Sequence, residues 1–170
     1  MAQPLAQTPS DLPHPGGAVL RAEQAGDADA IDRIVLAAFG PGRFAKTAER
    51  LREGGSVAAG FVTCVDDRPV GSVRLWSIRV GGTPCLFLGP IAVERSERSE
   101  GLGAAMVQAC IDQAREAGAA GILLVGDAPY FGRFGFARID GVALPGPVDP
   151  ARVLWLPLAV PDVTGPVTRA

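Results

Sequence analysis

Two glycines stand where the sequence predicts the first turn of a helix, in the segment Arg-Ser-Glu-Gly-Leu-Gly at residues 98–103. Glycine is a poor helix former, so its presence there indicates a need for bare backbone. The first N–H groups of a helix have no partners within it, and the helix dipole adds partial positive charge. Without side chains at Gly101 and Gly103, an oxyanion such as a phosphate or diphosphate can approach these amides closely. A flexible turn before a helix is the alternative interpretation, and the glycines alone leave it open.

Residue types that support other common chemistries are scarce. The single histidine, His14, lies in a proline-rich N-terminal segment, so the predicted domain contains no Ser-His-Asp triad, Cys-His pair or histidine-based metal site. Three cysteines lack Cys-x-x-Cys spacing, which favours reduced, buried thiols. The formal net charge of −2 argues against nucleic acid or an anionic membrane as the main partner. We therefore expect a cytoplasmic protein without a secretory signal, a membrane span or a bound metal.

The first part of the chain predicts a strand followed by two helices. Residues 18–24 form a short apolar strand candidate, and residues 26–40 place their apolar side chains at helical spacing, with Asp27 as the N-cap. Residues 43–55 repeat the helical pattern, with Phe44 on the apolar face and two glycines as the stop signal.

The next run has strand character throughout. Turn signals divide residues 56–93 into three strands, which are close in sequence and therefore predict an antiparallel meander. The third, residues 85–93, is apolar on both faces and is expected at the centre of the sheet. It contains Gly89 and Pro90, which indicate a bulge, because proline cannot donate to a ladder and an internal glycine weakens one. We expect this strand to part from a neighbour there.

A β-α-β unit completes the pattern. The helix that begins near Leu102 leads to an all-apolar strand at residues 120–127, which a crossover makes parallel to the strand before it. Residues 152–160 predict a closing strand, which is also a candidate for pairing across a dimer. The sequence predicts one mixed α/β (α+β) domain at residues 18–160, between an N-terminal tail at residues 1–17 and a C-terminal tail at residues 161–170.

Two nucleotide-binding motifs fit this loop poorly. A dinucleotide-binding fingerprint needs a third small residue where Met106 stands, and its first glycine should directly follow the strand. Asp127 imitates the acid that binds ribose in that motif, but the turn is wrong. The Gly-Lys-Ser/Thr of a phosphate-binding P-loop is absent from the sequence.

Four segments in order resemble the acetyl-CoA-binding core of the GNAT acetyltransferases, and especially its small bacterial predicted N-acetyltransferases. They are Leu-Gly-Pro-Ile-Ala-Val, the Arg-x-x-Gly-x-Gly loop, the Tyr-Phe…Gly-Phe segment at residues 130–136, and the opening strand and helix at residues 20–39. The resemblance implies a GNAT-like mixed sheet, with an antiparallel first half, a bulged central strand and helices on both faces. It also implies transfer of an acetyl group from acetyl-CoA to a primary amine by direct attack in a ternary complex, without a metal.

The resemblance assigns the cofactor site to backbone groups. The splayed strand binds the pantetheine arm, the glycine loop binds the diphosphate, and Phe131 packs against the cofactor arm or the core. The implied cofactor-binding residues are Ile91, Ala92, Val93, Arg98, Ser99, Glu100, Gly101, Leu102, Gly103, Ala104 and Phe131.

The chain departs from the family pattern at two positions. Glu100 stands where the family usually has a basic residue, beside the expected diphosphate. The tyrosine that commonly protonates the departing thiolate lies four residues before the glycine of Gly-Phe, and that position here is Phe131. Tyr130 is adjacent, so we consider it as the general acid, against a role in packing or substrate contact. Glu94 and Asp127 end the two parallel strands, so either could relay a proton from the amine through water, or be an ordinary strand-end carboxylate.

The expected partner is a small-molecule or peptide amine, and the expected state is a monomer or homodimer. Because of Glu100 and Phe131, a catalytically degenerate acyl-CoA-binding sensor or scaffold is the alternative function. Acetyl-CoA binding is common to both, and amine-dependent thiol release distinguishes them.

Overall fold

The computed structural model describes residues 12–13 and 17–170. The predicted N-terminal tail at residues 1–17, with His14, lies almost wholly outside these residues. The helices are α1 (Ala28–Phe39), α2 (Thr47–Arg52), α3 (Leu102–Glu116) and α4 (Ala128–Gly132). Short 3-10 turns are η1 (Ala25–Asp27), η2 (Pro41–Ala45), η3 (Arg95–Glu100) and η4 (Pro150–Arg152). The strands are β1 (Leu12–Pro13), β2 (Val19–Ala22), β3 (Val57–Val65), β4 (Arg68–Val80), β5 (Thr83–Val93), β6 (Gly121–Val125), β7 (Ala137–Arg138), β8 (Val142–Ala143), β9 (Val153–Pro157) and β10 (Gly165–Arg169).

One mixed sheet organises the chain, with the strand order β1-β2-β3-β4-β5-β6-β9-β7. The pairs from β2 to β5 are antiparallel, and β5 pairs with β6 in parallel through the α3 crossover. This confirms the predicted mixed α/β class, with its antiparallel first half and its β-α-β unit. Among the described residues, no helix is long and apolar enough to cross a membrane.

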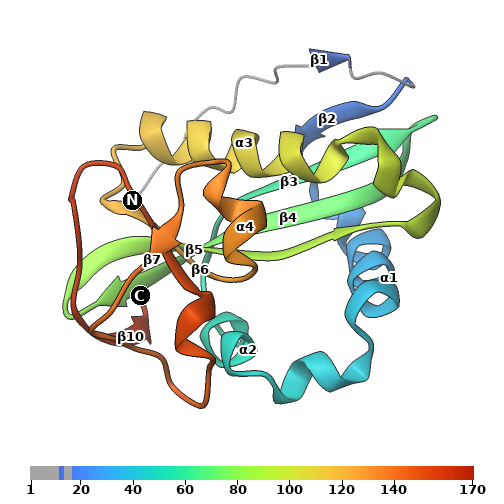
Figure 1. Ribbon diagram of the computed structural model, residues 1–170. Helices are drawn as coiled ribbons and strands as arrows, with labels where there is room; N and C mark the ends of the chain where they lie inside the picture. The colour runs from blue at the N-terminus through green and yellow to red at the C-terminus, as the bar shows by residue number, and fades with distance from the viewer. Residues whose placement is uncertain (1–11, 14–16) are drawn as a thin grey trace.

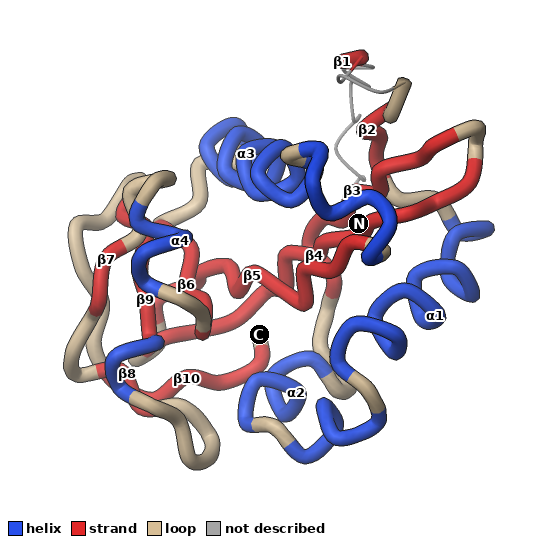
Figure 2. Tube along the Cα trace, turned by 45° about the vertical axis from the view of Figure 1, so that its right-hand side comes forward, coloured by secondary structure: helices blue, strands red, loops and turns tan. Residues whose placement is uncertain are grey.

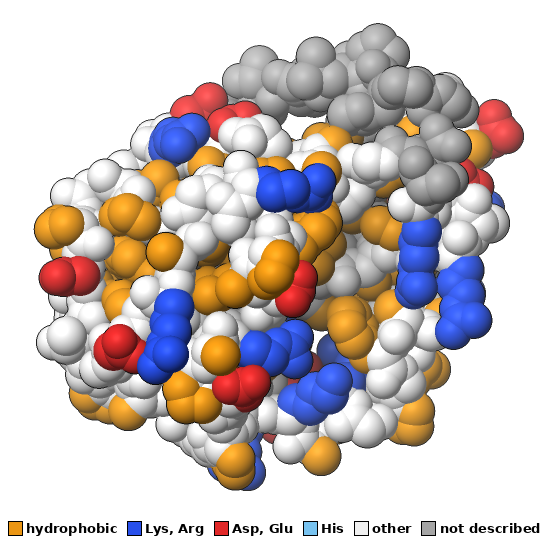
Figure 3. Space-filling view, viewed as in Figure 1, with side chains coloured by type: hydrophobic (Ala, Val, Ile, Leu, Met, Phe, Trp, Pro, Cys, Tyr) orange, Lys and Arg blue, Asp and Glu red, His pale blue; other side chains and the backbone are white. Residues whose placement is uncertain are grey.

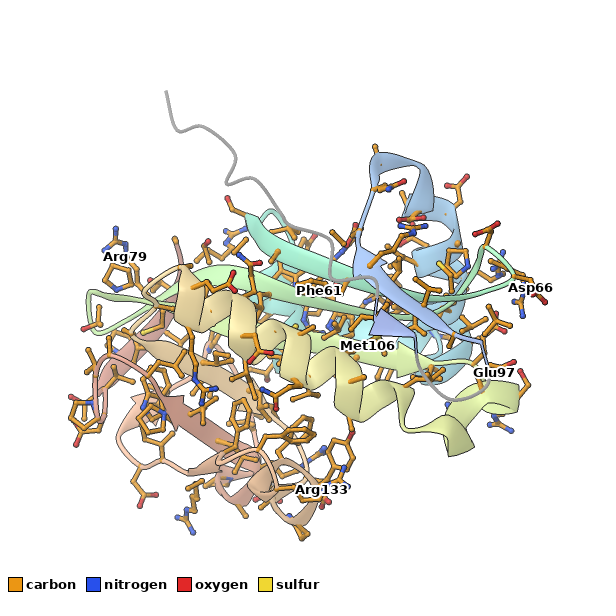
Figure 4. The ribbon with its side chains drawn as sticks, turned by 90° about the horizontal axis from the view of Figure 1, so that it is seen from above. Phe61, Asp66, Arg79, Glu97, Met106 and Arg133 are labelled. Carbon is orange, nitrogen blue, oxygen red and sulfur yellow. The ribbon has the colours of Figure 1, made fainter. Side chains whose placement is uncertain are left out.

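Helices cover both faces of the sheet (Figure 1). Helix α3 packs across β3, β4 and β5, where the buried side chains of Met106 and Cys110 meet Val73, Leu75 and Leu88. Figure 4 shows Met106 between α3 and the strands. On the other face, α1 packs its Ile31, Ile34 and Val35 side chains against Val62, Cys64 and Ala92, and Leu51 of α2 joins Trp76 and Phe87.

The second predicted helix is shorter than expected. Residues 43–45 belong to the 3-10 turn η2, and α2 begins only at Thr47. Phe44 is 61% exposed, so it does not lie on a buried face as predicted. Pro41 at the start of η2 fixes a tight turn there, and the chain extends at Lys46 before α2 begins.

The C-terminal segment also differs from expectation. Within residues 161–170, expected as a tail, β10 pairs antiparallel with Ile78 to Val80 of β4, beyond the point where β3 begins. This pairing fills the β4 edge that β3 leaves open. The candidate dimer strand β9 has neighbours on both sides, because Trp155 pairs with Leu123 of β6 and with Ala137 of β7. Residues 153–155 of that strand therefore offer no free edge for pairing across a dimer.

Candidate active site

The site lies where β5 and β6 separate. The two strands pair at Leu86–Ile122 and Phe87–Leu123, and no later pairing is present in the described chain. Just beyond this point, Gly89 and Pro90 together stand opposite the single residue Arg74 of β4, which is the predicted bulge. Gly89 has φ +132°, in the region that favours glycine. The sequence prediction of a splayed central strand is confirmed.

Backbone amides of β5 face this gap. The Glu94 N–H donates to Val70 O at 2.8 Å. Hydrogen-bonded and non-hydrogen-bonded pairs alternate in an antiparallel ladder, so Ala92 forms the next hydrogen-bonded pair, with Ser72 of β4. The N–H groups of Ile91 and Val93 therefore point away from β4, toward the side that β6 has left. Of the three predicted β5 residues, Ile91 and Val93 have backbone N–H groups that the pairing with β4 does not use. The Ala92 N–H is instead a donor in the ladder between β4 and β5.

The two glycines of the loop lack side chains for different structural reasons. Gly101 is the N-cap of α3 and has φ +70°, a left-handed conformation that side chains disfavour. A β-carbon built at Gly101 would meet no described atom of the chain within 4 Å, so the described part of the structure leaves the space beside it open. A β-carbon at Gly103 would lie 3.3 Å from Tyr130 Oη, so this glycine allows the hydroxyl to approach the first turn of α3. The Leu102 side chain is buried, and the residue can offer only its backbone to the loop.

Arg98 stands beside this loop. Its Nε donates to Val93 O at 3.1 Å, which places the guanidinium between the end of β5 and the start of α3. The backbone of Ser99 and Glu100 belongs to η3. The predicted roles of their side chains lie outside what the structure describes.

A cleft of about 730 Å³ joins these features. Its walls come from residues 88–93 of β5, Gly103 of α3, the end of β6, α4, η2 and α2, and the loop at residues 147–149. Figure 2 shows α3 and α4 on one side of strands β4 and β5, and α1 and α2 on the other side of these strands. In the space-filling view, Lys and Arg side chains gather around the hollow near α2 and the connection from α1 (Figure 3).

Tyr130 and Asp127 both reach the cleft from the same short helix. Asp127 is the N-cap of α4, and its carboxylate accepts the Tyr130 N–H at 3.2 Å. The Tyr130 ring packs edge-on against Phe131 at 4.9 Å between ring centroids, and the Arg133 guanidinium lies 4.4 Å from its centroid. Figure 4 shows Arg133 at this end of the molecule. The Tyr130 hydroxyl, near Gly103, is thus held at the junction of α3 and α4.

Of the predicted site residues Phe131 and Glu94, only Phe131 lines the cleft. Phe131 is 8% exposed, packs against Phe136 in the core below α3, and presents its remaining surface to the cleft. Glu94 does not line the cleft, because its carboxylate is paired with the Arg68 guanidinium at 2.8 and 2.9 Å. The structure therefore does not bring Glu94 together with Tyr130 and Asp127.

The family resemblance implied that Arg43 lies near the acceptor, but sequence reasoning missed the charged cluster that Arg43 forms with Glu49 and Arg52 on the α2 side of the cleft. Arg43 and Arg52 both line the cleft, and both approach one oxygen of Glu49, at 3.3 and 3.5 Å. Burial is the main cause that lowers the pKa of Arg52 to about 10, and the nearby Arg43 charge acts in the same direction. An alternating charge pattern on a short helix usually indicates a solvated face, so the residue pattern alone does not predict this cluster.

Comparison with known proteins identifies the family. Residues 28–136 match the acetyltransferase (GNAT) family. The uncharacterized N-acetyltransferase YhbS of Escherichia coli K12 is 31% identical over 121 residues, covering 69% of this chain and 72% of YhbS. The crystal structure of Escherichia coli YhbS in complex with CoA matches with a TM-score of 0.78 and 28% identity, over 90% of this chain and 89% of that one.

A second structure supports the fold alone. A GNAT family acetyltransferase from Brucella melitensis, solved in complex with acetyl-CoA, has a TM-score of 0.72 and 24% identity, over 90% of this chain and 96% of that one. The family match covers more than half of this chain and includes α1, the splayed strand, the glycine loop and α4. The resemblance noted in the sequence is confirmed, and the chain belongs to the GNAT family of N-acetyltransferases.

Proposed function

We propose that this protein transfers the acetyl group of acetyl-CoA to a primary amine by direct attack, with both substrates in the cleft between β5 and β6. The single observation that carries the proposal is the row of backbone donors from Ile91 and Val93 to the first turn of α3. These donors need no side-chain chemistry to bind a thioester and a diphosphate. The complex of YhbS with CoA supports this choice of co-substrate.

Separate parts of the site fit separate parts of acetyl-CoA. The N–H groups of Ile91 and Val93 suit the amide groups of an extended pantetheine arm, which can pair with a strand edge. The open left-handed Gly101, the amides that follow it and the Arg98 guanidinium suit the diphosphate. A thioester then lies near the bulge at Gly89, where a strand amide can stabilise negative charge on its carbonyl oxygen.

The transfer step balances without a covalent enzyme intermediate. A neutral amine nitrogen forms a bond to the acetyl carbon, and the bond between that carbon and sulfur breaks. The departing thiolate gains one proton and the attacking nitrogen loses one. We assign Tyr130 as the donor to the thiolate, a role that requires its hydroxyl to turn within the cleft from Gly103 toward the bulge. Asp127, the predicted carboxylate that lines the cleft, is assigned as the water-linked acceptor of the amine proton.

Two measurements test the proposal. Acetyl-CoA must raise the melting temperature, because a ligand that binds only the native state stabilises it. Thiol release from acetyl-CoA must then depend on an added amine. A melting temperature that saturating acetyl-CoA does not change would refute the cofactor site. Binding without amine-dependent thiol release would instead favour an acyl-CoA sensor or scaffold.

A further inference from the structure

Two arginines share one carboxylate on the α2 side of the cleft. Arg43 Nη1 lies 3.3 Å from Glu49 Oε2, and Arg52 Nη1 lies 3.5 Å from the same atom. Their side chains are only 17% and 14% exposed, and that of Glu49 is 13% exposed. The cluster therefore carries one positive charge more than its carboxylate balances, and water screens this charge poorly.

The hydrogen-bond donors of the cluster are also incompletely used. In the described part of the chain, the buried Nε atoms of Arg43 and Arg52 have no hydrogen-bond partner. Burying donors of a charged group without acceptors is costly, and each guanidinium also repels the other. A neighbouring arginine, Arg74, has no such deficit, because Glu23 accepts from its Nε at 2.9 Å and from its Nη2 at 2.5 Å. An anion between Arg43 and Arg52 would reduce the repulsion and supply acceptors.

A small side pocket adjoins this cluster. It has a volume of about 70 Å³ and shares Arg43, Arg52 and Pro90 with the main cleft. Its remaining wall includes Ser72 and Trp76 of β4. Since a single water needs roughly 10–15 Å³ of cavity volume, the pocket has room for a carboxylate.

The acidic residues around Arg43 and Arg52 do not neutralise the excess positive charge of the cluster. Glu49 is already engaged by both arginines. Asp32 lines the side pocket from α1, but it is exposed, and no ion pair joins it to Arg43 or Arg52 within the described chain. Lys46, which also lines the main cleft, adds a further positive charge on this side.

From this cluster and its pocket we infer that the amine acceptor carries a carboxylate close to its amino group, and that Arg43 and Arg52 bind that carboxylate. The inference rests on the proposed acetyl transfer and names the substrate class of that site. Planar guanidinium groups are well suited to carboxylates, because each can donate two parallel hydrogen bonds.

The position of the cluster sets the spacing within the acceptor. Arg52 lies directly against the splayed strand, since a β-carbon at Gly89 would be only 2.5 Å from its Nη2. A carboxylate held there leaves only a few bonds to an amine beside the bulge, where the thioester is proposed to lie. The acceptor class is therefore a small amino acid or an amino-terminal segment with an adjacent acidic group, and not a polyamine.

The first test compares matched acceptors with the unmodified enzyme. Amino acids and their carboxamides present the same amine with and without the carboxylate. We expect acetyl-CoA-dependent thiol release to favour the acid, with kcat/KM higher on the order of 10- to 100-fold. Peptides with an acidic or amidated second residue distinguish a peptide source of the carboxylate from a free amino acid.

Variants locate the preference. Arg52→Met keeps an unbranched apolar side chain against Phe87 and Gly89 but removes the charge. It should abolish the preference, so that kcat/KM for the acid and kcat/KM for the amide become equal within about threefold. Arg43→Met, in a different element, should act in the same direction, and Arg52→Lys should retain part of the preference. The control is Arg33→Met, on the exposed surface of α1 and outside the cleft.

The outcomes separate this inference from the proposed function. If the acid and the amide react equally well, or polyamines react best, the carboxylate inference is wrong while acetyl transfer stands. A preference for the acid that survives both methionine variants also overturns it, because the charge would then be recognised elsewhere. If no amine of any kind supports thiol release, the proposed transfer fails, and the inference that rests on it fails with it.

Discussion

The two ends of α3 provide a matched test of the proposed diphosphate site. Gly101 before the helix and Gly118 after it have nearly the same left-handed conformation, with φ of +70° and +68°. Within the described part of the chain, a β-carbon at either glycine would meet no atom closer than 4 Å. The variants Gly101→Ala and Gly118→Ala therefore impose the same backbone strain without a clash, and only Gly101 lies at the proposed cofactor site.

The expected stability loss is the same for both variants. An alanine in the left-handed region costs roughly 1–2 kcal/mol relative to glycine. For a domain of this size, each kcal/mol lowers the melting temperature by about 2–4 °C. Both variants should therefore melt roughly 2–8 °C below the parent protein, and they should do so by similar amounts.

Acetyl-CoA binding should distinguish the two variants. A methyl group at Gly101 projects into the open space where the diphosphate is expected, and losing one hydrogen bond to a charged group weakens binding about tenfold or more. Titration calorimetry should show this increase in Kd for Gly101→Ala and less than a twofold change for Gly118→Ala. Equal Kd values for the two variants would refute the reasoning that Gly101 is bare for the sake of an anion.

Two further variants test single side chains. Tyr130→Phe should lower kcat about 100-fold with little change in the Kd for acetyl-CoA, if the hydroxyl protonates the thiolate; an unchanged kcat in single-turnover assays would exclude that role. Asp27→Asn should lower the free energy of unfolding at pH 7 by about 2 kcal/mol, because Asp27 accepts from Arg21 at 2.7 and 2.9 Å. The hydrogen bond from Arg21 lowers the pKa of Asp27 in the folded protein. The contribution of Asp27 to the free energy of unfolding is therefore complete at pH values above the ordinary Asp pKa of about 3.9. It is lost as the pH falls through the lower pKa of the folded state. Urea unfolding of both proteins at pH 7 and below pH 4 should show the difference shrinking, and a constant difference would contradict this assignment.

Backbone features of the site were predictable because local sequence determines them. The Gly89-Pro90 pair cannot continue a regular ladder, so the bulge follows from residue type alone. Gly101 is predictable for a similar reason, since a glycine before an apolar helical repeat indicates an unusual φ or a close approach. The parallel β5–β6 pair follows from the α3 crossover between them.

Side-chain partners were less predictable because they depend on which side chains the fold places next to each other, whether near or far apart in sequence. Glu94 ends β5 as predicted, but Arg68 in the preceding hairpin turns its carboxylate away from the cleft. Asp27 precedes α1 as predicted, yet its carboxylate makes no cap hydrogen bond to that helix and instead binds Arg21 and the Gln24 N–H. In both cases, an arginine on a neighbouring strand decided the direction of an acid that the sequence placed correctly.

The same contrast between backbone and side-chain groups separates the proposed binding of acetyl-CoA from the proposed binding of the acceptor. The donors proposed for acetyl-CoA are mostly main-chain groups of β5 and α3, whose positions the fold fixes regardless of side-chain identity. The groups proposed for the acceptor, Arg43 and Arg52, are side chains of η2 and α2, outside the β-α-β unit. Substitutions at these arginines should therefore change which amine is acetylated while leaving the affinity for acetyl-CoA nearly unchanged. Substitutions in the glycine loop should do the reverse, because the two substrates depend on different elements of one cleft.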